Sequence, residues 1–120
     1  MPSNAALFAT DDGTGIVPED GIKVNTITSA ASMTIVADKV NVISGTVGTA
    51  TITLSVPDDN LAHVWDILMT TGSSVNVTFA TSNSATIKKP NGFAVGASKS
   101  CEISVIGVGS IFYLRYGEFT

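Results

Sequence analysis

The side chains that could perform chemistry are few and lie far apart in the sequence. His63 is the only histidine and Cys101 the only cysteine among the 120 residues. A hydrolytic triad needs a nucleophile held beside the histidine, and the sequence contains no Gly-x-Ser-x-Gly turn to supply one. Cys101 alternates with Ile103 and Val105, a pattern typical of a small buried side chain rather than of a nucleophile. We therefore expect no catalytic residues and no enzymatic activity.

Metal and cofactor sites are equally hard to build from this sequence. A single cysteine excludes a multi-cysteine zinc site. The segment Asp-Asp-Gly-Thr-Gly at 11–15 resembles the start of a calcium loop, but it lacks the alternating Asp residues and the distal Glu of an EF-hand. The acidic pair at 58–59 follows Pro57, which favours a turn. We expect neither a metal nor a cofactor; the alternative is a divalent ion shared between subunits at one of these acidic pairs.

The composition favours a protein that packs against other chains. Six Lys and Arg against ten Asp and Glu give a net charge of −4, which argues against nucleic acid as a partner. Hydrophobic residues make up 44% but charged residues only 13%, about half the share of roughly 25% in ordinary soluble domains. So few charges cover a surface poorly, and we expect part of that surface to be buried in an oligomer. The alternative is a polar surface of Thr and Ser.

No segment predicts contact with a membrane. No apolar run approaches the roughly 18 residues of a membrane span. The first residues lack the basic start and the apolar core of a signal peptide. These features agree with a lone cysteine that stays reduced.

Residues 1–22 predict an extended acidic N-terminal arm. They contain four acidic residues and no Lys or Arg, so they carry all of the net negative charge. Gly or Pro at 13, 15, 18 and 21 interrupts regular structure. The alternative is an ordinary frayed terminus. If this arm docks on a neighbouring protein, the candidate docking residues are its four apolar side chains Leu7, Phe8, Ile16 and Val17.

From residue 23 to residue 120 the pattern predicts a single all-β domain. Val, Ile and Thr are frequent, and apolar residues alternate with Thr and Ser, as at 49–56. Short strands separated by Gly, Pro and Asn favour an antiparallel β-sandwich or a jelly-roll-like domain. The expected strands lie at residues 22–28, 33–36, 39–44, 49–56, 63–69, 75–80, 85–88, 99–106 and 110–116.

The last predicted strand is apolar on both of its faces. Phe112, Leu114 and Tyr116 share one face, while Ile111 and Tyr113 lie on the other. A strand covered on both sides is either central in a sandwich or packed against a second subunit. The candidates for a subunit interface are Ile106, Ile111, Tyr113 and Arg115.

The second half of the chain resembles a small β-module found near the C-termini of tailed-bacteriophage virion proteins. The resemblance rests on Thr-Thr-Gly at 70–72, Pro-Asn-Gly-Phe at 90–93, Glu-Ile-Ser-Val at 102–105 and an aromatic last strand that ends close to residue 120. Proteins with this module include head fibres, capsid-decoration proteins and tail fibres. The module often ends in a strand that contains Trp, whereas the only tryptophan here is Trp65. Residues 1–62 show no such resemblance.

The resemblance implies a non-enzymatic structural protein of the virion, a homotrimer assembled in the host cytoplasm. Because the chain has no shaft repeats, it favours a capsid decoration or head-fibre component whose arm docks on the major capsid protein or another virion protein. The alternative is a tail-fibre or receptor-binding module that contacts a host glycan through loops at 58–60, 73–74 and 91–93. A third hypothesis, a free-standing lectin-like domain from a bacterium, predicts a monomer.

Overall fold

The computed structural model describes residues 21–119, and in this part of the chain all regular structure is β-sheet. The strands form one mixed sheet in the order β1-β3-β4-β6-β7-β5, with β2 paired to β3 off this path. Their bounds are β1 Val24–Thr28, β2 Ser32–Ile35, β3 Val40–Leu54, β4 His63–Thr81, β5 Thr86–Lys88, β6 Ser100–Val108 and β7 Ile111–Phe119. The predicted all-β fold is confirmed.

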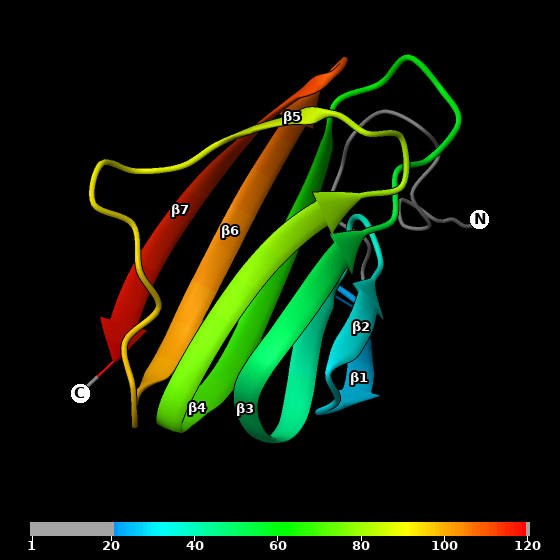
Figure 1. Cartoon of the computed structure of the whole chain (residues 1–120). Helices are drawn as coiled ribbons and strands as arrows, with labels where there is room; N and C mark the ends of the chain where they lie inside the picture. The colour runs from blue at the N-terminus through cyan, green and yellow to red at the C-terminus, as the bar shows by residue number, and fades with distance from the viewer. Residues whose placement is uncertain (1–20, 120) are drawn as a thin grey trace.

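The first four strands form three stacked windings of the chain (Figure 1): β1 with β2 makes the first, β3 the second and β4 the third. β3 and β4 are long and bend, so that residues 40–42 pair with 66–68 in one layer and residues 49–54 pair with 76–81 in the other. β1 pairs in parallel with the first half of β3, and β2 pairs in parallel with its second half. The segments 24–35, 40–54 and 63–81 therefore each run along one layer and return along the other.

The bends explain why nine predicted strands become seven. The predicted strands at 39–44 and 49–56 join to form β3, and those at 63–69 and 75–80 join to form β4. At the bend of β3, Gly45 has a φ of +85°, which a residue with a side chain rarely adopts. At the bend of β4, the Thr71 hydroxyl donates to the backbone oxygen of Gly96 at 2.6 Å. Turn-like residues here bend a strand instead of ending it.

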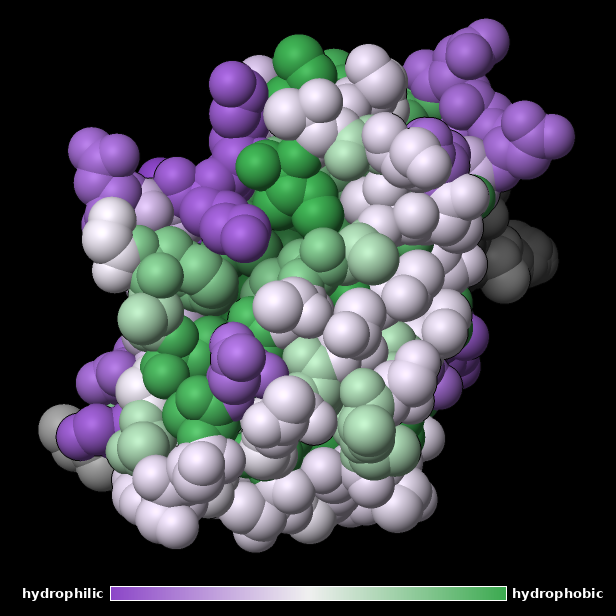
Figure 2. Space-filling model, viewed as in Figure 1, coloured by the Kyte–Doolittle hydropathy of each residue, from purple (hydrophilic) through white to green (hydrophobic). Residues whose placement is uncertain are grey.

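The strand directions differ from the prediction of an antiparallel sandwich or jelly roll. Only the β4–β6 and β6–β7 pairs are antiparallel, whereas the β1–β3, β2–β3, β3–β4 and β5–β7 pairs are parallel. Alternation of apolar and polar residues usually indicates antiparallel strands, because parallel sheets tend to be covered on both faces. In this chain hydroxyl side chains solvate the outer side of a parallel layer. Thr51 and Thr78 share a hydrogen bond there at 3.0 Å, and residues of intermediate hydropathy cover that side in Figure 2.

The core fills the space between the two layers. The indole N–H of Trp65 donates to the backbone oxygen of Ser55 at 3.2 Å, and its ring lies 5.1 Å from that of Phe112. Gly107 sits under both rings, and a Cβ there would lie 2.9 Å from Trp65 and 3.0 Å from Phe112. The buried apolar residues are Met33, Ile35, Ile43, Val47, Ala50, Ile52, Leu54, Trp65, Ile67, Met69, Cys101, Ile103, Val105, Phe112 and Leu114.

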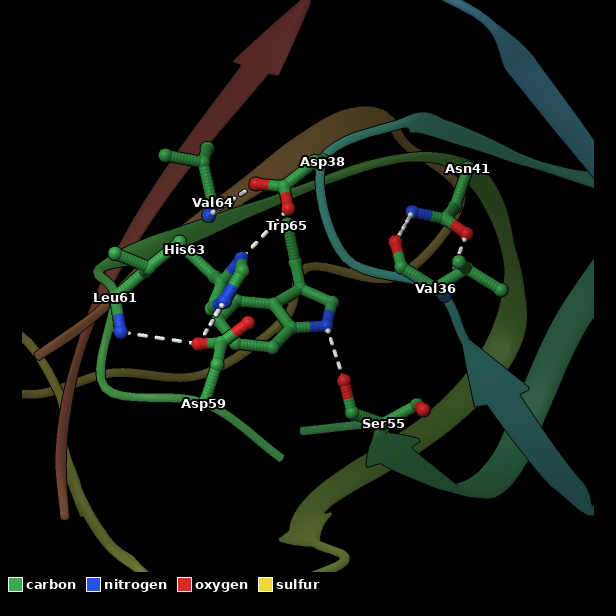
Figure 3. Close-up of polar contacts among 9 residues, drawn as sticks. All are labelled: Val36, Asp38, Asn41, Ser55, Asp59, Leu61, His63, Val64 and Trp65. Atoms are coloured by element: carbon green, nitrogen blue, oxygen red, sulfur yellow. Dashed lines mark hydrogen bonds and ion pairs between the residues drawn. The ribbon is translucent and has the colours of Figure 1, made fainter. Parts of the chain in front are cut away.

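The buried polar side chain of Asn41 on β3 forms hydrogen bonds to the segments before and after it in the stack (Figure 3). Its amide nitrogen donates to the backbone oxygens of Val36 at 3.0 Å and Asp66 at 3.2 Å. Its amide oxygen accepts from the Val36 backbone N–H at 3.0 Å and from the Asn25 side chain at 2.9 Å. Because the Asn41 amide is itself fully buried, it needs these partners, and the hydrogen bonds hold the end of β2 against the start of β3.

Candidate functional site

The main candidate site is the solvent side of β4, β6 and β7, which we call the outer face. Its apolar part consists of five residues that lie opposite or beside one another across the three strands: Val64, Ile106, Val108, Ile111 and Tyr113. Val64 lies opposite Ile106, which lies opposite Tyr113, and the three are 46%, 48% and 50% exposed. Neighbouring side chains of this kind form a continuous apolar surface.

The predicted interface residues Ile106, Ile111, Tyr113 and Arg115 all lie on this face and are exposed. Sequence analysis missed Val64 and Val108, although both lie directly beside predicted members. The missing information was the order of the strands, since only pairing of β4 with β6 brings Val64 next to Ile106. The order of strands in a sheet is set by the tertiary structure and cannot be deduced from the pattern within one strand.

Charged groups lie next to the apolar part of the outer face. One row across β4, β6 and β7 consists of Asp66, Ser104 and Arg115. Glu102 lies two residues from Ser104 on the same side of β6. The protonated carboxyl of Glu102 can donate a hydrogen bond to the Asp66 carboxylate, and this bond, with some desolvation and like-charge repulsion, raises the pKa of Glu102. Arg115 has no ion-pair partner within residues 21–119. The face therefore carries an acidic pair on β4 and β6, and on the adjacent strand β7 a base without an ion-pair partner among the described residues.

A second cluster surrounds His63 at the start of β4 (Figure 3). Nδ1 of the ring lies 2.6 Å from Asp38 and Nε2 lies 2.8 Å from Asp59. The hydrogen bond to Asp59 is the main reason that the pKa of His63 is raised, and Asp38 adds to it. Asp59 in turn accepts the backbone N–H of Leu61, which lowers the pKa of Asp59.

His63 links two connections of the chain, the one before β3 and the one before β4, and we call this cluster the clasp. With both ring nitrogens bonded to carboxylates, the imidazolium form is favoured, and neither nitrogen is free to act as a base or a metal ligand. Asp38 belongs to the turn before β3 and Asp59 to the connection before β4. Sequence analysis placed His63 at the start of an expected strand but could not assign Asp38 to it, because the two are 25 positions apart.

A shallow hollow of about 400 Å³ lies beside this clasp at one end of the sandwich. Its polar lining comes from two connections, residues 58–60 and residues 82–83. Of the three predicted receptor-binding loops, only that at 58–60 lines it; residues 73–74 lie at the bend of β4, and Phe93 lines a separate groove. Residues 82–83 were not predicted as part of any site.

The remaining groups offer no convergent chemistry in the described part of the chain. Cys101 is buried, and burial raises the pKa of its thiol, which favours the protonated form. Within residues 21–119 no three His, Cys, Asp or Glu side chains gather as metal ligands would. None of the described segments is a helix long and apolar enough to cross a membrane.

The four predicted docking residues of the arm, Leu7, Phe8, Ile16 and Val17, lie outside the described residues, so their role stays a prediction. The motifs that carry the resemblance lie in the described part. Thr71 contacts Gly96, and the Phe93 ring lies 5.8 Å from that of Tyr116. No protein-family model matches the chain, and no curated protein is significantly similar to it.

Proposed function

We propose that this protein is a non-enzymatic structural component that assembles as a homotrimer through its outer face. In the context that the resemblance implies, it decorates a tailed-phage capsid or forms part of a head fibre. The single observation that carries the proposal is the continuous apolar surface formed by Val64, Ile106 and Tyr113 on adjacent strands. Burial of such a surface contributes roughly 25 cal/mol for each Å² removed from water, so association is favourable.

The charges on the outer face support a cyclic arrangement of copies. In a heterologous ring, each copy presents a different part of the face to each neighbour. Arg115 of one copy can then meet the acidic pair Asp66 and Glu102 of the next. Repulsion between Asp66 and Glu102 contributes to the raised pKa of Glu102, and a guanidinium from a neighbouring copy would offset that repulsion.

The packing of the resembling motifs supports the virion context. The turn at 70–72, the loop at 90–93 and strands β6 and β7 are distant in sequence, yet they contact one another through Thr71, Phe93 and Tyr116. A set of motifs that packs as one unit is expected of a module shared among related proteins. The function itself is inferred from the resemblance and from the outer face.

The test is a double substitution on the outer face. Ile111→Asp with Tyr113→Asp places two charges where burial is proposed, and we expect it to convert the oligomer into a folded monomer. The matched control is Thr34→Asp with Thr49→Asp, which adds the same charge to exposed positions on the opposite layer. Light scattering measures mass and circular dichroism measures folding. An oligomer that survives the first pair as well as the control pair would refute the proposal.

A second candidate function, binding of a host glycan by a tail-fibre module, is supported by the hollow near His63. Carboxylate and amide side chains of Asp58, Asn60 and Asn83 line it, and such groups commonly bind sugar hydroxyls. Asn60→Ala with Asn83→Ala is then expected to abolish binding on a glycan array. Retention of binding, or no binding by the wild type, would contradict this candidate.

A further inference from the structure

The second half of β4 is an open strand edge. Its first half lies between β3 and β6, but β6 pairs only with residues 63–70. On the side away from β3, the backbone of residues 73–80 makes no hydrogen bond to any other described residue. An open edge presents a row of unpaired N–H and C=O groups, which proteins normally cover or pair.

A groove of mixed polarity, with apolar side chains in both walls, runs beside this edge. One wall is β4 itself, with Val75 and Val77, and the other is the segment after β5, with Phe93 and Val95. Lys89 lies at the rim, with its ammonium 5.9 Å from the centre of the Phe93 ring. Figure 2 shows hydrophobic residues gathered in a hollow between the second half of β4 and this segment. A free edge next to apolar pockets is the site at which an extended peptide adds to a sheet.

Residues 1–20 of the chain have the composition to fill this groove. Within residues 1–20, positions 3–12 form the longest stretch without Gly or Pro, so this stretch can form a regular strand. They include Leu7 and Phe8 as apolar side chains and end in two acidic residues, Asp11 and Asp12. When extended, ten residues span about 33 Å, longer than the open edge.

Charge favours the same occupant. Lys89 is the one charged side chain that lines the groove, whereas residues 1–20 contain four acids and no base. Glu118 and Lys99 both lie next to Gly96, further along the segment that forms the second wall, so their charges offset each other there. An acidic strand is therefore attracted to this edge rather than repelled by it.

We propose that residues 3–12 of this chain add as an extra strand to the open edge of β4 and place Leu7 or Phe8 in the groove beside Phe93. The inserted strand pairs the free backbone groups of residues 73–80 and covers Val75 and Val77. This inference does not rest on self-association through the outer face, because the arm of the same copy or of a neighbouring copy satisfies it.

Disulfide trapping tests the contact directly. In a Cys101→Ser background, Ala6→Cys is combined with Ala94→Cys, an exposed position on the groove wall. The control combines Ala6→Cys with Thr34→Cys, which is exposed on β2. We expect mild oxidation to cross-link the groove pair at least ten times faster, and gel mobility shows whether the bond lies within or between chains. Equal rates for the two pairs would overturn the proposal.

Hydrogen exchange provides the second test. Deletion of residues 2–12 is expected to speed amide exchange of residues 75–79 at least tenfold while leaving the amides of β6 unchanged. Addition of a peptide with the sequence of residues 3–12 is expected to restore protection, and the same peptide with Leu7→Asp and Phe8→Asp is not. If a folded deletion variant exchanges at 75–79 as slowly as the full chain, the edge is not covered by this segment.

Discussion

Ile106 and Tyr113 lie opposite each other on the antiparallel strands β6 and β7, and each keeps about half of its surface exposed. On their own strands they alternate with Val105 and Phe112, which are buried in the core. The two strands are therefore apolar on both sides, although the described chain covers only one of them. A second copy of the chain is the partner that our account places on the other side.

The charges on the outer face give a sharper prediction than its apolar residues. Arg115→Glu alone is expected to dissociate the proposed trimer, because it places three carboxyl groups at each proposed contact. Adding Asp66→Lys and Glu102→Lys to Arg115→Glu reverses both signs and is expected to restore association at low salt. Sedimentation of the variants measures this. If the triple variant stays monomeric while the wild type is trimeric, Arg115 does not meet the acidic pair.

The clasp at His63 predicts that stability depends on pH. A raised pKa means that the folded protein binds the proton more tightly than the unfolded chain does. The stabilisation is therefore complete below the ordinary histidine pKa of 6.5 and is lost as the pH rises through the raised value in the folded protein.

This prediction has a simple control, because His63 is the only histidine. We expect the Tm of the wild type to fall relative to that of His63→Gln as the pH rises from about 6 to about 9. The glutamine side chain retains hydrogen-bonding groups but does not titrate. Parallel Tm profiles for the two proteins would show that the contacts to Asp38 and Asp59 do not contribute in this way.

Asn41 is expected to be one of the most sensitive positions in the fold. Asn41→Ala removes the partner of the Val36 N–H and of three backbone oxygens, those of Val36, Lys39 and Asp66. We expect the free energy of unfolding to fall by about 3 kcal/mol. Asn25→Ala is the control, since it removes one of the same hydrogen bonds from a less buried position and is expected to cost about 1 kcal/mol. Urea denaturation measures both, and similar small losses would contradict the role given to Asn41.

The close packing at Gly107 predicts a difference between two glycines on neighbouring strands. Gly107→Ala places a methyl group against Trp65 and Phe112 and is expected to lower the free energy of unfolding by about 2 kcal/mol. Gly117→Ala on β7 meets open space and is expected to change it by less than about 0.5 kcal/mol. Thermal unfolding compares them. Equal effects would mean that the core adapts to the extra methyl group.

Much of the strand pattern could be predicted from the sequence, because burial imposes alternation. Every predicted strand overlaps an observed one, and the inward side of β6, with Cys101 and Ile103, is as expected. The bends at Gly45 and Thr71 were interpreted as strand ends, since turn residues look the same in both cases. Strand direction was not accessible, because alternation determines which side is buried and not which way a neighbour runs.

The candidate site was predictable only within single strands. Alternation predicted that Tyr113 faces away from Phe112 and Leu114, and the structure has it on the outer face. Ile106 lies on that face too, on the side of β6 away from Cys101. The pairing of Val64 with Ile106 depends on strand order, and the contact of His63 with Asp38 joins residues 25 positions apart. Asn41 could not be recognised because a buried amide in a strand has the same sequence pattern as an exposed one.

The mass of the wild-type protein in solution tests the central claim most directly. Light scattering over a range of concentrations is expected to give three times 12.3 kDa, about 37 kDa. Ile111→Asp with Tyr113→Asp is expected to give 12.3 kDa under the same conditions. A wild-type mass of 12.3 kDa at every concentration would contradict a trimer assembled through the outer face.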